Sequence, residues 1–450
     1  MGNRASLRLG NIVFETWKDQ VDDSIMALFS ESEKRIQQIT PDPDDEPLDD
    51  DDEPSTLLRV EYATNIKVLM KRLDFVGFTL NTCRQMFDIA KTKEIRDRKR
   101  WIEDHNANFG DEAKKQQNEY YSTRINLLSQ ADADTWLLEL RQAFLAPPDA
   151  DPGELSELAN SLRPGGLPHF LNPRFPEAYD ERFRLRFELE ALQTGEAVLD
   201  ISDLVDYGYC SPSDPLSSWA REWVQTRDRE ALHLIVLTEG SSDKFVLESA
   251  LRVLRPELTE YISFMDFAAF KVEGGASFLA NMVRSFAGAG IRDRIVAIFD
   301  NDTAGCSAQS MLSKQDLPVN IKVMRYPDIV LARNYPTQGP SGDVTMDVNG
   351  SAASIELYLG RDVLAEPNGA LVPVQWKALD PIMKRYQGEV VRKRGCITRF
   401  SEKLLKFERS SETSDLSDWR DLGTIIDAIC SAFEDSDREF LLDEANWAAS

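Results

Sequence analysis

Two apolar runs of this sequence end abruptly in carboxylates. Residues 234–237 (Leu-Ile-Val-Leu) lead into Glu239, and residues 295–299 (Ile-Val-Ala-Ile-Phe) lead into Asp300 and Asp302. Continuous apolar runs are typical of strands that are buried on both faces of a sheet. Ligands bind at the carboxyl ends of such strands, and one Glu with an Asp-x-Asp pair is a hard-oxygen set that Mg²⁺ or Mn²⁺ prefers. The pattern therefore predicts a divalent-metal site at the edge of a parallel sheet.

The two aspartates are two residues apart in an extended segment, so both carboxylates can face one cavity. Three acids held together repel one another and raise one another's pKa unless a cation lies between them. We therefore expect a bound divalent metal, with a carboxylate that is not a ligand free for acid–base chemistry. The alternative is that these acids only cap helices or contact solvent at the sheet edge.

The turn after Glu239 has a composition that suits phosphate. Gly240 permits a tight turn that other residues would strain. Ser241, Ser242 and Asp243 offer a cap for a following helix, and a helix N-terminus attracts phosphate. We expect Gly240, Ser241 and Ser242 to bind phosphate.

Residues 231–326 alternate between short apolar runs and amphipathic stretches. Strands are predicted at residues 232–238, 261–267, 294–299 and 320–325, with helices between them. Alternation on this period predicts a parallel sheet with right-handed crossovers.

The sequence before this region is predicted to be mainly helical. A strand or hairpin is expected within residues 7–17, a helix along 21–36, and almost continuous helix over 56–145. Residues 41–54 form an expected acidic loop because charge repulsion and prolines oppose compact structure. Residues 146–178 are interpreted as a proline-rich connector.

Fewer signals mark the remaining segments. Residues 182–190 alternate like a strand, but the spacing of their apolar residues favours a helix. A Pro/Gly loop is expected at 327–350, a short helix near 352–359, and further helices from about residue 375 onwards.

The composition restricts the kinds of partner that the protein can bind. The 52 basic and 77 acidic residues give a net charge of −25, which argues against nonspecific coating of nucleic acid, since phosphate binding depends on Lys and Arg. A local basic surface stays compatible with this balance, and a divalent ion would offset acid at the site.

Cysteine and histidine usage argues against a zinc site. The five cysteines are scattered without a Cys-x-x-Cys pair, and there are only three histidines. Unpaired thiols fit a reducing compartment. With no signal peptide and no apolar run long enough to cross a bilayer, the expectation is a cytoplasmic protein without membrane contact.

Three segments together resemble the TOPRIM domain of topoisomerases, bacterial primases and nucleases of the overcoming-lysogenisation-defect family. They are Leu237-Thr-Glu-Gly240, Val272-Glu-Gly-Gly275 and Ile298-Phe-Asp-Asn-Asp302. This resemblance implies that Glu239 is the general acid or base and that Asp300 and Asp302 are Mg²⁺ ligands in the catalytic centre.

The resemblance extends beyond the predicted sheet. Residues 1–11, 263–267, 301–304 and 346–360 are similar to a bacterial family with a HEPN/Toprim-associated N-terminal domain followed by TOPRIM. The implied fold is α/β plus α. It consists of a helical HEPN-like domain at 1–200, a Rossmann-like TOPRIM domain with a parallel sheet at 230–360, and a helical C-terminal region at 361–450.

Two further residues join the candidate centre. Glu356 lies where TOPRIM nucleases often supply an extra acidic metal ligand, so that a second ion could clamp the attacking and leaving oxygens. Its alternative is an exposed helix residue. Lys393 could contact phosphate or stabilise the transition state, or it is an ordinary surface lysine.

The helical half carries a second chemical motif. Four residues separate Arg100 from His105, the spacing seen in HEPN ribonucleases, where an Arg–His pair promotes attack of a ribose 2′-hydroxyl without metal. Trp101 departs from the small polar residue that active motifs favour at this position. The alternative is a solvated helix face that serves as scaffold or partner surface.

The leading hypothesis is a metal-dependent nuclease acting on DNA or RNA, in prokaryotic defence or nucleic-acid processing by resemblance. One alternative is a HEPN-type metal-independent ribonuclease regulated by TOPRIM. Another is a non-catalytic module that binds nucleic acid or a partner. The helical domain is the expected surface for a second copy or a partner protein.

Overall fold

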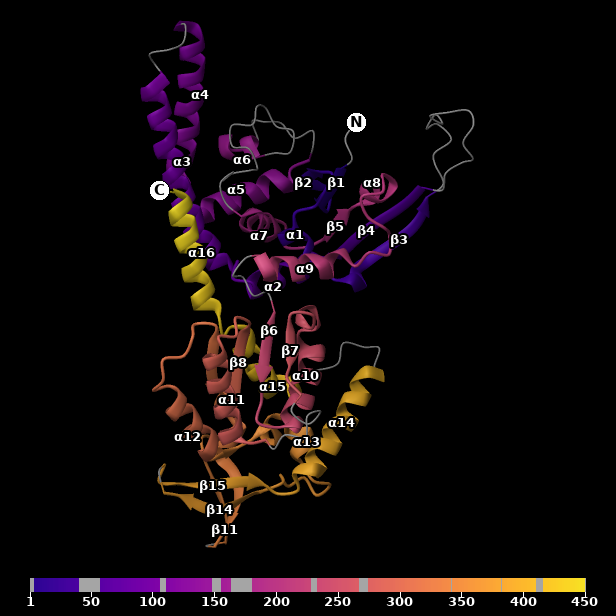
Figure 1. Ribbon diagram of the computed structural model, residues 1–450, viewed down its shortest axis with the longest axis vertical. Helices are drawn as coiled ribbons and strands as arrows, with labels where there is room; N and C mark the ends of the chain where they lie inside the picture. The colour runs from indigo at the N-terminus through magenta and orange to yellow at the C-terminus, as the bar shows by residue number, and fades with distance from the viewer. Residues whose placement is uncertain are drawn as a thin grey trace. The chain divides into compact units, whose positions relative to one another are not determined.

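The chain forms two compact units in the computed structural model, which describes residues 4–39, 57–105, 111–147, 155–162, 180–227, 233–266, 274–340, 342–381, 383–409 and 416–449. The first unit comprises residues 1–230 and 434–450, and the second comprises residues 231–433 (Figure 1). The predicted acidic loop at 41–54 and most of the predicted connector at 146–178 lie outside the described residues.

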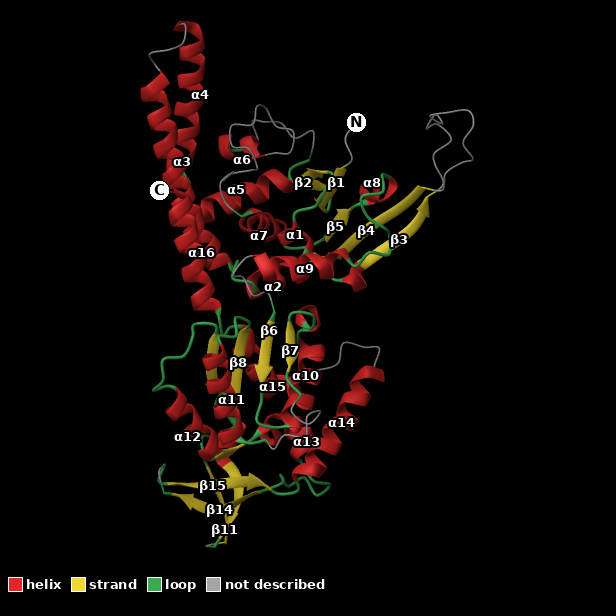
Figure 2. Cartoon of the chain, viewed as in Figure 1, coloured by secondary structure: helices red, strands yellow, loops and turns green. Residues whose placement is uncertain are grey.

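The first unit contains a five-stranded antiparallel sheet (Figure 2). Its strands, in spatial order, are β2 (Ile12–Lys18), β1 (Arg4–Leu9), β5 (Glu196–Asp200), β4 (Leu57–Asn65) and β3 (Lys34–Ile39). The hairpin of β1 and β2 confirms the strand or hairpin expected within residues 7–17. The unit therefore contains more strand than the mainly helical domain that the sequence pattern predicts.

Strands β3 and β4 correct two helix predictions. The helix predicted along 21–36 is only the short helix α1 (Asp23–Met26), and β3 follows it. The helix predicted from residue 57 begins at Ile66, because β4 pairs along its length with β3 and β5. Val60 and Tyr62 are fully buried on this strand. Packing across strands thus prevails over the helical spacing of the apolar residues.

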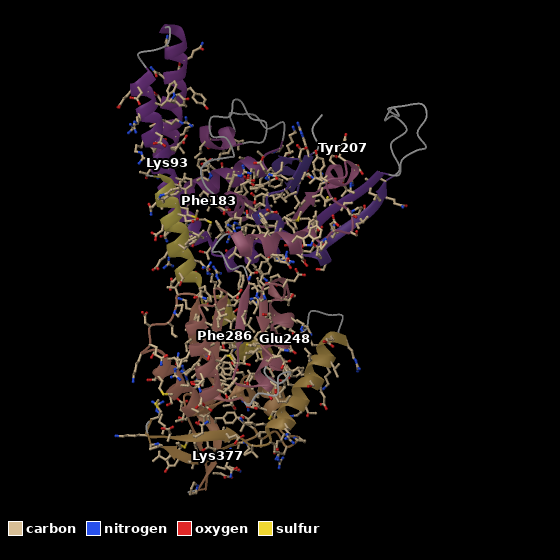
Figure 3. The ribbon with its side chains drawn as sticks, viewed as in Figure 1. Lys93, Phe183, Tyr207, Glu248, Phe286 and Lys377 are labelled. Atoms are coloured by element: carbon tan, nitrogen blue, oxygen red, sulfur yellow. The ribbon has the colours of Figure 1, made fainter. Side chains whose placement is uncertain are left out.

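Helices surround this sheet. Besides α1 they are α2 (Ile66–Phe75), α3 (Leu80–His105), α4 (Asp111–Gln130), α5 (Ala133–Leu145), α6 (Glu157–Leu162), α7 (Glu181–Leu192), α8 (Ser202–Asp206), α9 (Leu216–Arg227) and α16 (Glu434–Ala449). The helix α7 confirms the helical interpretation of residues 182–190. Its residue Phe183 lies in the core (Figure 3). The helix α16 packs along α3, where Lys93 Nζ donates to the carbonyl oxygen of Ala448.

The second unit is built on a four-stranded parallel sheet, as the sequence predicts. Its spatial order is β10 (Ile321–Arg325), β8 (Arg294–Phe299), β6 (Leu234–Leu237) and β7 (Ile262–Phe264). The crossover helices are α10 (Ser241–Leu254), α11 (Ala276–Ala289) and α12 (Thr303–Leu312). Ile295, Ala297 and Phe299 of β8 pack with α11 and α12 in one buried cluster. Val296 and Ile298, also fully buried, alternate onto the other face.

The remainder of this unit contains a second sheet that sequence analysis misses. Its spatial order is β12 (Gly342–Met346), β11 (Tyr335–Gly339), β14 (Val374–Asp380) and β15 (Arg385–Val390). A further two-stranded pair joins β9 (Asn301–Asp302) to β13 (Ala352–Ala353). The helices are α13 (Arg361–Leu364), α14 (Lys393–Arg409) and α15 (Arg420–Cys430).

Three predictions are wrong here. The loop predicted at 327–350 contains the hairpin of β11 and β12. The helix predicted near 352–359 is strand β13 followed by a single 3-10 turn, Ile355–Tyr358. The region 361–450 is not all helical, since it contains β14 and β15, and its last helix belongs to the first unit. None of the helices within the described ranges is both long and apolar enough to cross a bilayer.

Candidate active site

The two predicted acid-bearing turns meet in the structure. Glu239 follows β6 and Asp300 follows β8, and these strands are parallel neighbours. Their carboxyl ends therefore lie at one edge of the sheet. The backbone N–H of Asp300 donates to Glu239 Oε1 at 3.0 Å. Both residues are half-buried, and Asp300 Oδ1 is itself buried.

Two glycines make room for these turns. A Cβ atom at Gly274 would lie 2.3 Å from the carbonyl oxygen of Glu239, and one at Gly305 would lie 2.1 Å from that of Asp300. In both cases the obstruction is backbone, which cannot rotate away as a side chain can. The backbone that carries each acid is thus packed against a position that tolerates only glycine.

Asp302 is buried and already holds two donors. Its Oδ1 accepts from the backbone N–H of Gly305 at 2.8 Å, which caps the start of α12, and its Oδ2 accepts from Gln387 of β15. Asn301, between the two aspartates, contacts other partners: Arg325 donates to its Oδ1 at 2.9 Å. This alternation is the one expected of an extended segment.

Asp243 is a member of this cluster that sequence analysis treats only as a helix cap. It lies in the first turn of α10 and is 6 % exposed, and Tyr326 Oη donates to its Oδ1 at 3.1 Å. Burial and then the charge of Glu356 raise its pKa to about 7, while Tyr326 and Lys393 lower it. In the sequence, the only sign of this role is an acidic residue four positions after Glu239. An acid in the first turn of a helix is common, because it interacts favourably with the helix dipole.

Glu356 is buried, so it is not the exposed helix residue that the alternative interpretation of the sequence predicts. It is 4 % exposed, and Ser354 Oγ donates to its Oε2 at 2.6 Å. Lys393 Nζ lies 3.9 Å from the same oxygen and 3.6 Å from Glu389 Oε1. The structure therefore brings both residues to the acids after β6 and β8, with Lys393 still 37 % exposed.

Charge repulsion and burial act together on these acids. Burial and then the neighbouring Asp302 raise the pKa of Glu239 to about 8, with a smaller opposing effect of Lys393. Burial, followed by the charges of Asp243 and Glu239, raises the pKa of Asp300 well above its ordinary value. The five acids are Glu239, Asp243, Asp300, Asp302 and Glu356. A nearby cation would relieve their mutual repulsion.

The fit of a metal ion rests on the donor atoms. Asp300 Oδ1 is buried and has no hydrogen-bond partner. In the part of the chain that the structure describes, no three His, Cys, Asp or Glu side chains are arranged to hold a metal ion as they stand. The donor chemistry fits a hard divalent cation, and its binding would require side-chain movement. Glu239, Asp300, Asp302 and Glu356 are the candidate ligands.

The remaining predicted residues are less informative. Gly240 is the N-cap of α10 without a side-chain hydrogen bond, and Ser241 and Ser242 are exposed at its start. Their phosphate binding stays a prediction. Arg100 of α3 is exposed and lies 3.8 Å from Asp104, while the side chain of His105 lies outside the described part of the chain.

Comparison with known proteins gives one match. Residues 1–224 match the family model described as HEPN/Toprim N-terminal domain 1. Neither curated proteins nor solved structures give a match to the chain. The matched range covers the five-stranded sheet of the first unit and most of α9.

Proposed function

Since the chain belongs to the family that carries the HEPN/Toprim N-terminal domain, we propose that its second unit is a TOPRIM-type nuclease domain. It cleaves phosphodiester bonds of DNA or RNA with Mg²⁺ or Mn²⁺. The observation that carries this proposal is the contact between Glu239 and Asp300 at the carboxyl edge of a parallel sheet, with Asp243, Asp302 and Glu356 electrostatically close.

The residues have separable roles in this proposal. Asp300, Asp302 and Glu356 hold the metal, and Glu239 is the general acid or base. When bound, a divalent ion neutralises phosphate charge and lowers the pKa of water. Glu239, with its pKa of about 8, can accept or give up a proton near neutral pH. Lys393, which lies 3.9 Å from Glu356 and is itself 37 % exposed, contacts a phosphate oxygen.

A basic segment beside the acids supports a nucleic-acid substrate. Residues 374–395 contain six basic residues and two acidic ones, in a chain whose net charge is −25. Lys377 of β14 lies in this segment and forms an ion pair with Glu389 (Figure 3). The strand β15 contacts the site directly, because Gln387 donates to Asp302 and Thr303 Oγ1 donates to the carbonyl oxygen of Tyr386. Local positive charge is what binding of a phosphate backbone requires.

The test uses the full chain with labelled single-stranded and double-stranded DNA and with RNA, in Mg²⁺, Mn²⁺ or EDTA. Wild type should cleave at least one substrate in a divalent ion, and Asp300→Asn should lose at least a hundredfold in rate. The matched control is Asp343→Asn, an exposed acid of β12 in the same unit, which should keep full rate.

Two outcomes would count against the proposal. If wild type binds neither ion by calorimetry and cuts none of the substrates, the second unit is not a metal-dependent nuclease. RNA cleavage that survives EDTA, leaves cyclic phosphate ends and disappears in His105→Ala would instead assign the chemistry to the Arg100–His105 pair.

A further inference from the structure

The first unit contains a pocket that the proposed nuclease chemistry does not use. Its volume is about 470 Å³, within the range of small-molecule sites. The segment after β2, helix α1, helix α8 with the segment after it, and helix α9 form its walls. All of these elements belong to the first unit.

Aromatic side chains dominate one wall. Trp219 and Trp223 are four residues apart on α9, so they share one face of the helix. They are 50 % and 53 % exposed, and Tyr209, which also lines the pocket, is 53 % exposed. Large aromatic surfaces gathered around one cavity mark a binding site more often than isolated exposed side chains do.

Carboxylates also line the pocket. Asp19 and Asp23 line the pocket, and the described residues of the lining include no basic side chain. Tyr209 Oη donates to Asp19 Oδ1 at 3.2 Å, which ties a carboxylate to the aromatic wall. Lys18 lies 4.0 Å from Asp19, but its side chain is 75 % exposed, so solvent weakens this pair. Such a lining repels anions, including nucleotides.

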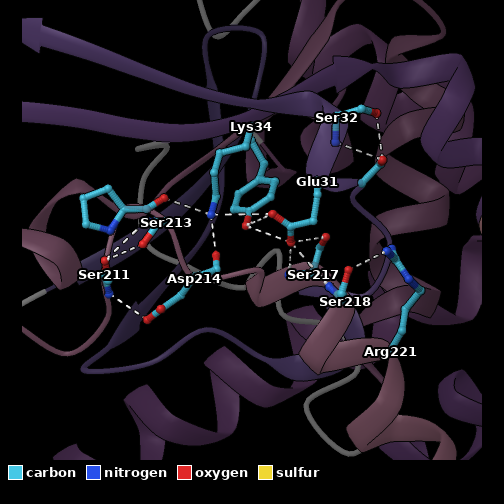
Figure 4. Close-up of polar contacts among 12 residues, drawn as sticks. Glu31, Ser32, Lys34, Ser211, Ser213, Asp214, Ser217, Ser218 and Arg221 are labelled. Atoms are coloured by element: carbon cyan, nitrogen blue, oxygen red, sulfur yellow. Dashed lines mark hydrogen bonds and ion pairs between the residues drawn. The ribbon is translucent and has the colours of Figure 1, made fainter.

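The helix that carries the tryptophans is held firmly (Figure 4). Glu31 Oε1 accepts from the backbone N–H of Ser217 at 2.8 Å and from its hydroxyl at 2.7 Å. Arg221 donates to the carbonyl oxygen of Phe29, and Lys34 donates to that of Pro212 at 3.1 Å. Partly buried polar contacts at the start of α9 and just before it thus fix the aromatic wall before any ligand binds, which lowers the entropic cost of binding.

We propose that this pocket binds an organic cation through an ammonium or guanidinium group. The faces of Trp219 and Trp223 attract the positive charge, because an aromatic face is the negative pole of its quadrupole. Asp19 and Asp23 neutralise the same charge. The group is carried either by a free small molecule or by a basic side chain of a partner protein.

The test follows tryptophan fluorescence and calorimetry of the full chain with two cationic probes. One probe is free agmatine, and the other is an N-acetylated tripeptide amide with a central arginine. The same peptide with citrulline in place of arginine is the uncharged control. Wild type should bind a cationic probe saturably, and the citrulline peptide should bind at least tenfold more weakly.

Matched variants separate the pocket from other sites. Trp219→Ala, Trp223→Ala and Asp19→Asn should each weaken binding about tenfold or more. Trp447→Ala, which removes an 82 % exposed tryptophan of α16, should leave binding unchanged. Circular dichroism checks folding, and the surface change Asp19→Asn keeps the test decisive if a tryptophan variant fails to fold.

The probes also distinguish the source of the cation. Binding of agmatine shows that a free cation suffices, whereas binding of the arginine peptide alone points to a partner's side chain, and both results support the proposal. It is overturned if no cationic probe binds saturably, if the citrulline peptide binds as tightly as the arginine peptide, or if folded Asp19→Asn binds as wild type does.

Discussion

Both units bury carboxylates, but they treat them differently. In the first unit, buried arginines of α7 accompany the acids: Arg184 lies 2.9 Å from the buried Glu15, and Arg186 lies 2.9 Å from the half-buried Asp74. In the second unit, five acids gather at one sheet edge. Among the described residues, Lys393 is the cation that lowers the pKa of both Glu239 and Asp243.

This difference distinguishes buried charges that stabilise the fold from buried charges that serve a function. A buried acid with an arginine partner has its charge compensated within the chain and contributes to a defined core. Acids that raise one another's pKa destabilise the fold unless something else compensates them, and such groups gather at functional sites. Loss of a buried arginine is thus expected to lower the free energy of unfolding of the first unit. Loss of an acid from the cluster is expected to raise that of the second unit.

The largest effect is expected when an arginine of the first unit is removed. Arg184→Met leaves Glu15 and Glu188 buried without their guanidinium, so the free energy of unfolding should fall by about 3–5 kcal/mol. Urea denaturation measures this change. Arg100→Met, at an exposed arginine of the same unit, should cost less than about 1 kcal/mol. Equal decreases in the free energy of unfolding of the two variants would contradict the view that buried arginines compensate the acids of the first unit.

Divalent ions should stabilise only the acid cluster of the second unit. At about a hundred times its dissociation constant, Mn²⁺ should raise the free energy of unfolding by about 2.7 kcal/mol. Thermal unfolding with and without the ion measures it. The effect should vanish in Asp300→Asn and persist in Asp343→Asn, and an equal shift in both variants would point to nonspecific ion binding.

Glu188 is a buried acid of the first unit whose pKa stays raised beside an arginine, as that of Asp74 does beside Arg186, and pH tests it. Burial raises its pKa to about 8 from an ordinary 4.5, although Arg184 opposes this. The folded state therefore binds more protons than the unfolded state between these values, so stability falls as pH rises from about 4.5 to 8, by on the order of 2 kcal/mol. Denaturation of wild type and Glu188→Gln across this window should show the fall reduced in the variant. An identical pH profile in both would show that Arg184 fully compensates Glu188.

The smallest effect concerns the acids themselves. Asp300→Asn removes a buried ionisable group from a repelling cluster, so without divalent ions the free energy of unfolding should rise by about 1 kcal/mol. The same variant should lose nuclease activity. Chemical denaturation in EDTA provides the measurement, and a destabilised variant would mean that the acids are compensated within the chain.

Local sequence patterns predict the parallel sheet well. Its four strands match the predicted ranges within a few residues, because doubly covered strands need continuous apolar runs. The contact of Glu239 with Asp300 follows from adjacent parallel strands. Both inferences depend only on short stretches of chain and on general rules of sheet topology.

Long-range packing limits what the sequence can predict. Asp243 enters the acid cluster through Tyr326, 83 residues away in the chain, and no local pattern encodes this contact. The strand β4 has helical spacing, and only its pairing with β3 and β5 makes it a strand. Likewise Gly388 permits β15 to approach β13, since a Cβ there would lie 2.5 Å from that of Ala352.

The glycines beneath the acid-bearing turns allow charge and position to be varied independently. Exchanging Asp300 for Asn alters charge while the main chain stays where it is. Exchanging Gly305 for Ala leaves every charge in place but forces the main chain of Asp300 to move. A pair of such variants would therefore report separately how much of the chemistry depends on the electric field at the sheet edge and how much on ångström-scale alignment.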